Sequence, residues 1–266
     1  MLLDHRELGA WRWLLGGTAL LLSLFLLLPL LLIVALSFDS SQWLQFPPPS
    51  WTLHWYAQVF ADPDWLSSLR ASLEVGVSVT VLSVGIGLCA SFALVRGRFR
   101  GRAFLRAFFV TPMILPSVVL AVALYGVFLR LHLNGTLAGF VLAHLVLALP
   151  FSIIPITSAL EQFDGAVEDA AVLCGATRWQ ARLRITVPAI SLALVSAAIF
   201  SFLASWDEVV VAIFMASPGL QTLPVRIWGE LRQNLSPDIA VVSTLLVLGS
   251  AVLMGLAAMV RRGASS

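Results

Sequence analysis

Long stretches without a charged residue are the feature that most restricts how this chain can fold. A helix needs about 20 mostly apolar residues to cross the hydrocarbon core of a bilayer, because the core is about 30 Å thick and each residue adds about 1.5 Å. Six such stretches occur, and we therefore expect an all-α integral membrane protein with six transmembrane helices. They are Trp13–Phe38, Val75–Val95, the segment between Arg106 and Arg130, Leu133–Leu160, a segment from near Ile185 to at least Trp206, and Ile239–Val260.

The composition favours the same class of protein. Of the 266 residues, 59% are hydrophobic and 11% are charged, whereas charged residues make up about a quarter of a typical soluble domain. The formal net charge of +2 is too small to indicate a nucleic-acid partner. The first apolar stretch is longer than the roughly 7–15 residues of a signal-peptide core, so we expect it to be a retained span.

Arginine placement predicts the orientation, because short cytoplasmic loops carry an excess of basic residues. The opposite loop, 39–66, has no arginine but has three aspartates and four tryptophans, which suit an outer interface. We expect a single transmembrane domain over 1–266, with both termini and the loop 161–184 in the cytoplasm and the loop 39–66 in the periplasm. Twelve of the sixteen arginines lie on the cytoplasmic side of this topology: Arg6, Arg12, Arg96, Arg98, Arg100, Arg102, Arg106, Arg178, Arg182, Arg184, Arg261 and Arg262.

The arginine run over 96–102 has two interpretations. It has the composition of a lipid- or nucleic-acid-binding patch, but the positive-inside rule accounts for it fully. The chain has no lysine, which excludes a lysine-dependent P-loop and a Schiff-base lysine. Cys89 and Cys174 are expected to be buried small apolar residues and not disulfide or metal ligands. The chain is therefore not expected to carry an ordinary nucleotide-hydrolysing site by itself, and we also expect no catalytic residues, no metal site and no cofactor bound by it.

The loop between the fourth and fifth spans has an unusual pattern. Residues Ala166–Leu173 favour a short helix, with Asp164 as its N-cap and acidic residues in its first turn. Gly175 supplies a permissive helix end, and a second short helix can run through Trp179 before Pro188 opens the next span. Such a compact knob suits docking into a groove on a soluble partner, although a solvated amphipathic turn would have the same pattern.

The spacing in this loop resembles a known family signature. In order, the loop carries Asp169-Ala170-Ala171, three residues, Gly175, nine residues, Ile185, one residue and Val187-Pro188. This spacing is similar to the EAA loop of ATP-binding-cassette (ABC) import permeases. Asp169 stands where glutamate is usual, and Val187 replaces a frequent leucine. The resemblance implies a MetI-like ABC permease architecture and a coupling helix that sits in a cleft of an ATPase subunit. The coupling residues that it implies are Glu168, Asp169, Ala170, Ala171, Gly175, Arg178, Trp179 and Pro188.

The C-terminal third is similar to permeases of the spermidine/putrescine type, especially their second, C-type subunit. The segments concerned are 205–211, 223–226 and 236–239. This resemblance implies location in the bacterial inner membrane and import of a small amine-containing solute. It also implies three partners: a homologous second permease subunit, a dimeric ABC ATPase that holds ATP and Mg, and a periplasmic substrate-binding protein.

The acidic pair Asp207-Glu208 is the candidate translocation site. A helix from near Thr186 to about Met215 would hold both acids in the outer part of the membrane, where a charge costs about 2.5–3.5 kcal/mol and tends to face a cavity or a partner. The alternatives are that the pair marks the outer interface or binds an arginine of the sister subunit. The candidate substrate pathway comprises Ser205, Trp206, Asp207, Glu208 and Ser117.

Two of these residues leave further alternatives open. Trp206 has the chemistry to stack on a cationic ligand or to anchor the outer interface. Ser117 follows Pro116, where related polyamine permeases often carry an acid, so a singly charged amine or an amino acid with a distant ammonium also fits.

The remaining spans carry few signals. Pro112 and Pro116 predict a kink in span three, either towards a pore or for packing. His144 is expected to be a hydrogen-bonded interior residue and not a proton relay. A proton- or sodium-driven secondary transporter of small amines is the alternative function, but it would need internal repeats that the sequence does not show. A membrane-embedded enzyme would need clustered polar residues within the spans.

Overall fold

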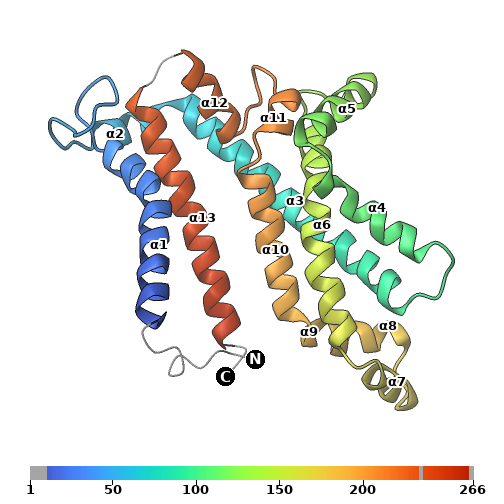
Figure 1. The fold of residues 1–266 in the computed structure, drawn as a ribbon. Coiled ribbons are helices and arrows are strands. Elements are labelled where there is room, and N and C mark those ends of the chain that lie inside the picture. The colour runs from blue at the N-terminus through green and yellow to red at the C-terminus, as the bar shows by residue number, and fades with distance from the viewer. Residues whose placement is uncertain (1–10, 234–235, 264–266) are drawn as a thin grey trace. The chain divides into compact units, whose positions relative to one another are not determined.

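The computed structural model describes residues 11–233 and 236–263, and its regular elements over these ranges are helices (Figure 1). They are α1 (Trp11–Leu36), α2 (His54–Ala61), α3 (Pro63–Arg96), α4 (Arg102–Ile114), α5 (Ser117–Arg130), α6 (Leu137–Gln162), α7 (Ala166–Leu173), α8 (Arg178–Ala181), the π-helix η1 (Arg182–Thr186), α9 (Val187–Ala189), α10 (Ser191–Trp206), α11 (Val210–Met215), α12 (Leu223–Gln233) and α13 (Pro237–Gly263).

The chain divides into two compact units. The first comprises the residues up to Asp62 together with Glu230–Leu248, and the second comprises Pro63–Gly229 together with the residues from Gly249. In the first unit, the large apolar side chains of α1, such as Leu21 and Leu26, are mostly exposed. A helix that is apolar on all sides is suited to a lipid or protein environment. All the candidate site residues lie in the second unit.

Six crossings are consistent with the described helices. Four helices are long and apolar enough to span a membrane, over Trp13–Leu36, Pro63–Arg96, Leu137–Gln162 and Pro237–Gly255. Two further candidates are bent pairs, in which α4 and α5 meet at 107° and Arg178–Ala189 meets Ser191–Trp206 at 73°. Counting each bent pair as one crossing gives the predicted six, and the all-α membrane fold class is confirmed. The orientation of the termini stays a prediction.

Three helices of the second unit, α3, α6 and α10, pack against one another. Small and polar side chains allow their close approach. Ser83 of α3 donates a hydrogen bond to Ser152 of α6 over 2.9 Å, and its hydroxyl lies 3.1 Å from that of Ser201 on α10. A Cβ added at Gly76 would come within 2.9 Å of the Phe202 ring on α10. Such interfaces are typical of membrane helices, where close packing and interhelical hydrogen bonds drive association.

The predicted kink in span three is confirmed. Pro112 lies inside α4, and Leu115 and Pro116 have extended backbones between the two helices. Proline lacks the amide donor and keeps its predecessor out of the helical region. Pro116 and its extended predecessor Leu115 therefore divide one apolar stretch into two helices, whereas α4 continues past Pro112 to Ile114.

The expectation that both cysteines are buried is wrong. Cys89 and Cys174 are free thiols with exposed side chains. Cys89 lies on α3, whose Gly87 and Ser91 are buried, whereas Cys174 directly follows α7. In a membrane helix, a face that contacts lipid is as apolar as a face that contacts protein, so an apolar sequence does not reveal which side is packed.

Candidate functional site

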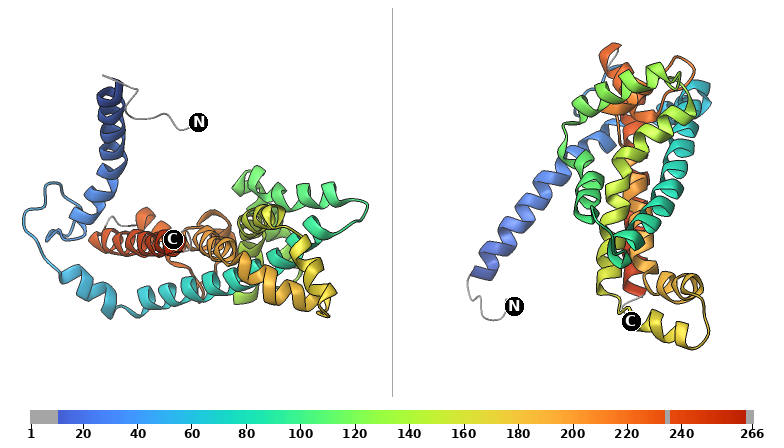
Figure 2. Two further views of the ribbon diagram at one scale, coloured as in Figure 1. Left: turned by 90° about the horizontal axis from the view of Figure 1, so that it is seen from below. Right: turned by 90° about the vertical axis from the view of Figure 1, so that its right-hand side faces the viewer.

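The loop 161–184 forms a knob that projects beyond the ends of α6 and α10, as Figure 2 shows. The predicted helix Ala166–Leu173 is confirmed as α7. The N-cap is Gly165, one residue after the predicted Asp164, and the backbone amide of Ala166 donates to the Asp164 carboxylate over 2.9 Å. Gly175 has φ +92°, a conformation that favours glycine. The second predicted helix begins after it as α8.

Helix α8 is short, but its first turn is fully capped. The Thr177 hydroxyl accepts from the Gln180 amide over 3.2 Å, and the Gln180 side chain accepts from the Thr177 amide over 2.9 Å. This reciprocal capping box satisfies two otherwise unpaired donors. The turn between α7 and α8 is therefore a defined structure and not a loose connection.

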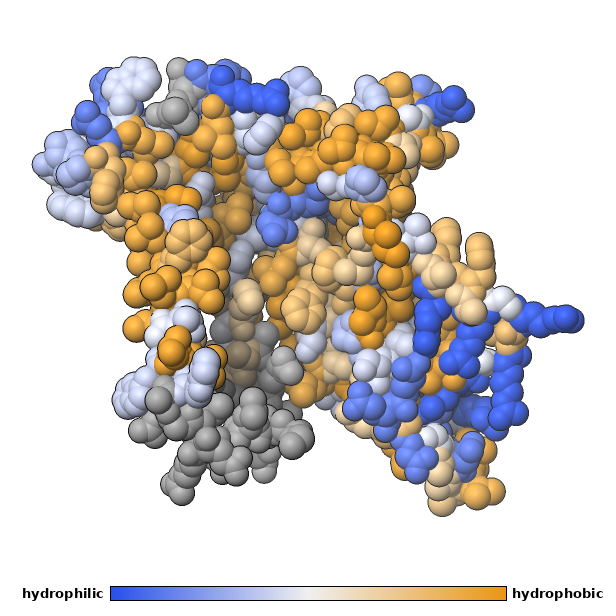
Figure 3. All heavy atoms as spheres, viewed as in Figure 1, coloured by the Kyte–Doolittle hydropathy of each residue, from blue (hydrophilic) through white to orange (hydrophobic). Residues whose placement is uncertain are grey.

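The outer face of the knob is exposed. Leu173 is 88% exposed and Trp179 is 62% exposed, and Ala170 is exposed beside them. Asp169 and Arg178 lie 3.7 Å apart at the surface. Apolar and charged groups therefore alternate on this face, and Figure 3 shows hydrophilic side chains gathered over this end of the second unit.

Glu168, the neighbour of Asp169, faces the opposite way. It is 8% exposed, and its Oε1 accepts hydrogen bonds from Thr186 Oγ1 over 3.0 Å and from Arg96 Nε over 3.2 Å. Arg182 Nε lies 4.0 Å from Oε2. Arg96 also donates to the Phe163 carbonyl over 2.9 Å. The Glu168 carboxylate therefore connects α7 to the end of α3 and to the beginning of the fifth span.

Sequence reasoning missed Arg96, Arg182 and Thr186 as parts of the site. The sequence presents Arg182 as a marker of topology, and Arg96 as such a marker or as part of a lipid- or nucleic-acid-binding patch. The one signal in the sequence for this pairing is Glu168, an acidic residue directly before the Asp169 motif that has the opposite charge to Arg96 and Arg182.

Pro188 lies in α9, just after the π-helix η1. Proline has no backbone N–H, so the regular helical ladder is interrupted here. A π-helical turn is rare and frequently marks a functional site. Together these features account for the 73° bend between Arg178–Ala189 and Ser191–Trp206.

The prediction of one helix through Asp207 and Glu208 is wrong. Helix α10 ends at Trp206, and α11 begins at Val210. The Glu208 carboxylate accepts backbone N–H groups from Val210 (3.0 Å), Val211 (3.1 Å) and Ala212 (2.9 Å). Glutamate thereby satisfies the free donors that every helix N-terminus presents, and the break in the helix is stabilised by the acid itself.

The other pathway candidates are placed differently. Asp207 is exposed. Ser205 is buried, and its hydroxyl lies 2.9 Å from His144 Nδ1, which confirms His144 as a hydrogen-bonded interior residue. Trp206 is buried and stacks on Phe202 with ring centroids 5.4 Å apart. The role of Trp206 in the pathway stays a prediction.

Ser117 begins α5, directly after the break in span three, and it is exposed. Helix α5 packs against α11, the helix that Glu208 caps. The second half of the interrupted third span therefore contacts the short helix that follows the fifth span.

Comparison with known proteins gives a consistent result. Residues 83–265 match a family model described as the inner membrane component of binding-protein-dependent transport systems. The Escherichia coli K12 putrescine transport system permease protein PotI is 32% identical over 238 residues, which cover 87% of this chain and 84% of PotI. The spermidine/putrescine transport system permease protein PotC of the same strain is 28% identical over 247 residues, which cover 91% of this chain and 92% of PotC.

A solved structure shares the fold. It is a bacterial ABC transporter involved in the import of the acidic polysaccharide alginate, with a TM-score of 0.73 and 16% sequence identity. The match covers 96% of this chain and 97% of the other. A related structure, with an alginate pentasaccharide-bound periplasmic protein, matches with a TM-score of 0.69 and 15% identity.

Proposed function

The chain belongs to the family of inner membrane components of binding-protein-dependent transport systems, and on this premise we propose that it imports a small cationic amine and receives work from a partner ATPase through the loop 161–184. As a permease of this family, it is a multi-pass inner-membrane protein. In the proposed assembly, a homologous permease completes the translocation pathway, a dimeric ATPase binds ATP and Mg, and a periplasmic protein delivers the substrate.

The main support for the coupling role is that the knob has two distinct faces. Its outer face presents Leu173, Asp169 and Arg178 to solvent, as a docking surface must, whereas the partly exposed Trp179 lies towards α3. Its inner face is fixed to α3 and to the fifth span through Glu168. A force applied to α7 would therefore reach two membrane helices directly, as a rigid lever that switches access to the pathway requires.

The amine substrate is supported by Asp207 and by the relatives. PotI and PotC are named as putrescine and spermidine/putrescine permeases. Asp207 is an exposed acid directly after the fifth span, where its carboxylate attracts a cation through Coulomb forces. Glu208 is occupied by three backbone donors, so we assign it a structural role and Asp207 the contact with the ammonium group or with the pathway.

The test is transport by the assembled complex in proteoliposomes, with the binding protein outside and labelled putrescine as the probe. We expect uptake that requires ATP and that persists when ionophores collapse the proton and sodium gradients. Uptake driven by an ion gradient without ATP would instead support a secondary carrier. ATP-driven uptake of a different solute, with no uptake of putrescine or spermidine, would contradict the amine assignment and leave the coupling role intact.

A further inference from the structure

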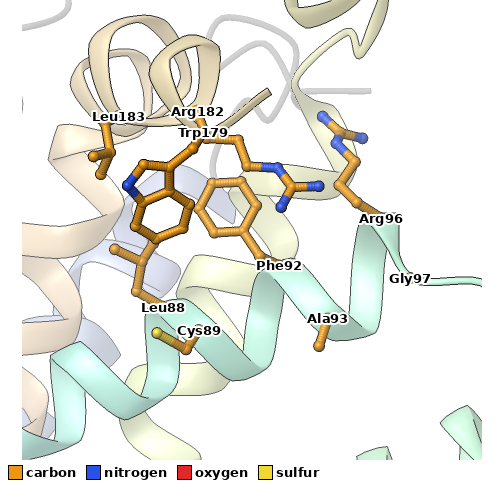
Figure 4. A pocket seen from close by; sticks show the side chains of 9 residues that line it. All are labelled: Leu88, Cys89, Phe92, Ala93, Arg96, Gly97, Trp179, Arg182 and Leu183. Atoms are coloured by element: carbon orange, nitrogen blue, oxygen red, sulfur yellow. The ribbon is translucent and has the colours of Figure 1, made fainter. Parts of the chain in front are cut away.

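A cavity of about 310 Å³ lies between the last turns of α3 and the segment formed by α8 and η1 (Figure 4). Its walls are mostly apolar and come from both sides: Leu88 and Phe92 on α3, Trp179 on α8 and Leu183 on η1. Arg96 and Arg182 also line it. In Figure 4 their guanidinium groups lie on the same side of the cavity, the Phe92 ring lies between the Trp179 ring and the Arg182 guanidinium, and Leu88 is farther along α3.

The two guanidinium groups share a single carboxylate. Arg96 Nε is bonded to Glu168 over 3.2 Å, whereas Arg182 Nε is buried, lies 4.0 Å from the nearer Glu168 oxygen and forms no hydrogen bond. The Arg182 guanidinium carbon stacks 5.3 Å from the centroid of the Phe92 ring. The rim of the cavity therefore carries one positive charge more than its own acid neutralises.

The apolar part extends along a membrane span. Leu88 and Arg96 are separated by two turns of α3, or about 12 Å along the helix axis. This length suits several methylene groups of an acyl chain, and a free phosphate or a small soluble anion would leave it unfilled. Arginines near the cytoplasmic end of a span are also suitably placed for lipid headgroups, since basic pockets between membrane helices bind anionic lipids.

We propose that this cavity binds one anionic phospholipid, with the phosphate at Arg182 and Arg96 and an acyl chain along Leu88 and Phe92. The bound lipid would neutralise the surplus charge of the rim. It would also lie against η1, the segment that links the knob to the fifth span. Lipid binding at this cavity requires that the chain lies in a membrane, but it does not depend on the identity of the transported solute or on ATP coupling.

The test is photo-crosslinking of the assembled transporter in phosphatidylcholine vesicles. The vesicles contain a minor fraction of either phosphatidylglycerol or phosphatidylcholine with a diazirine in the acyl chain, and the labelled peptides are identified by mass spectrometry. We expect phosphatidylglycerol to label the peptides that contain residues 88–97 and 179–183 more than phosphatidylcholine does. Glycerol phosphate, which has the headgroup but no chain, should compete poorly.

Two variants probe the two halves of the cavity. Arg182→Gln should lower the labelling of these peptides by phosphatidylglycerol about fivefold, the factor that corresponds to about 1 kcal/mol for one basic residue near a membrane surface. Ala93→Trp fills the cavity without changing a charge and should abolish the labelling. Arg184→Gln is the matched control, because Arg184 is exposed on the same π-helix but does not line the cavity.

Three outcomes would overturn the proposal. The first is equal labelling of these peptides by the two lipids. The second is labelling by phosphatidylglycerol that neither Arg182→Gln nor Ala93→Trp lowers. The third is labelling that occurs in the permease pair alone and disappears when the ATPase is bound, which would show that a side chain of the ATPase occupies the cavity. Because Ala93→Trp keeps both arginines and Glu168, the proposal stays testable if Arg182→Gln prevents assembly.

Discussion

Adjacent acidic residues have opposite environments at two places in this chain. In the knob, Glu168 is buried and bonded to Thr186 and Arg96, whereas Asp169 is exposed. After the fifth span, Glu208 binds three backbone amides, whereas Asp207 is exposed. The longer side chain can fold back onto the protein in both pairs, and the shorter one stays available for another molecule. Substitutions of the two glutamates should therefore affect stability, and substitutions of the two aspartates should affect function.

The pair in the knob gives the first prediction. Glu168→Gln should lower the thermal stability of the purified permease pair, because a charge-assisted hydrogen bond of this kind contributes about 1.5–3 kcal/mol. Asp169→Asn should leave the melting temperature unchanged, since an exposed ion pair contributes about 0–1 kcal/mol, but it should weaken copurification of the ATPase. Equal melting temperatures for the two variants would contradict the inward role of Glu168.

The pair after the fifth span gives the second prediction. Asp207→Asn should lower uptake of labelled putrescine by the assembled transporter without changing its melting temperature. Glu208→Ala should lower the melting temperature, because three amides lose their acceptor and each unsatisfied buried group costs about 1–3 kcal/mol. Glu74→Gln, in an exposed pair with Arg70, is the control for loss of an acid. Normal uptake by Asp207→Asn would exclude Asp207 from the pathway.

At the scale of elements, the sequence predicted the helices that carry clear boundary signals. Helix α7 begins and ends where Asp164 and Gly175 indicated, and Pro112 and Pro116 mark the kink in span three. The sequence did not predict the end of the helix at Asp207–Val209, because the residues after this break are as apolar as those before it. The capping role of Glu208 depends on where its carboxylate folds in three dimensions, and spacing alone does not show this.

The glycine between α7 and α8 gives a third prediction, at this scale. Gly175→Ala forces a side chain into a left-handed backbone conformation, which costs about 1–2 kcal/mol, and should misplace α8 relative to α7. We expect lower ATP-driven uptake with retained ATP hydrolysis by the complex, which is the signature of uncoupling. Gly165→Ala is the matched control in the same loop, because its φ of −64° suits any residue. An equal loss in both variants would indicate general damage to the loop.

At the scale of the whole molecule, fold and substrate are separate questions. The solved transporter that shares this fold is involved in the import of the acidic polysaccharide alginate, whereas PotI and PotC are named for the transport of putrescine and of spermidine/putrescine. The same helical framework therefore serves solutes of opposite charge. We expect local groups such as Asp207 and the binding protein to determine the substrate of this chain, and hydropathy and span count do not reveal it.

The orientation of the whole chain decides whether the knob can meet an ATPase at all, and the exposed thiol of Cys174 offers a direct test. A membrane-impermeant maleimide should label Cys174 in inverted membrane vesicles and not in intact cells, and bound ATPase should protect it. Cys174→Ser measures the background from Cys89. In that background, Trp43→Cys should react from the outside, because Trp43 is 68% exposed in the loop predicted to be periplasmic. Labelling of Cys174 in intact cells would place the knob in the periplasm, where no ATPase could reach it, and would exclude the coupling role.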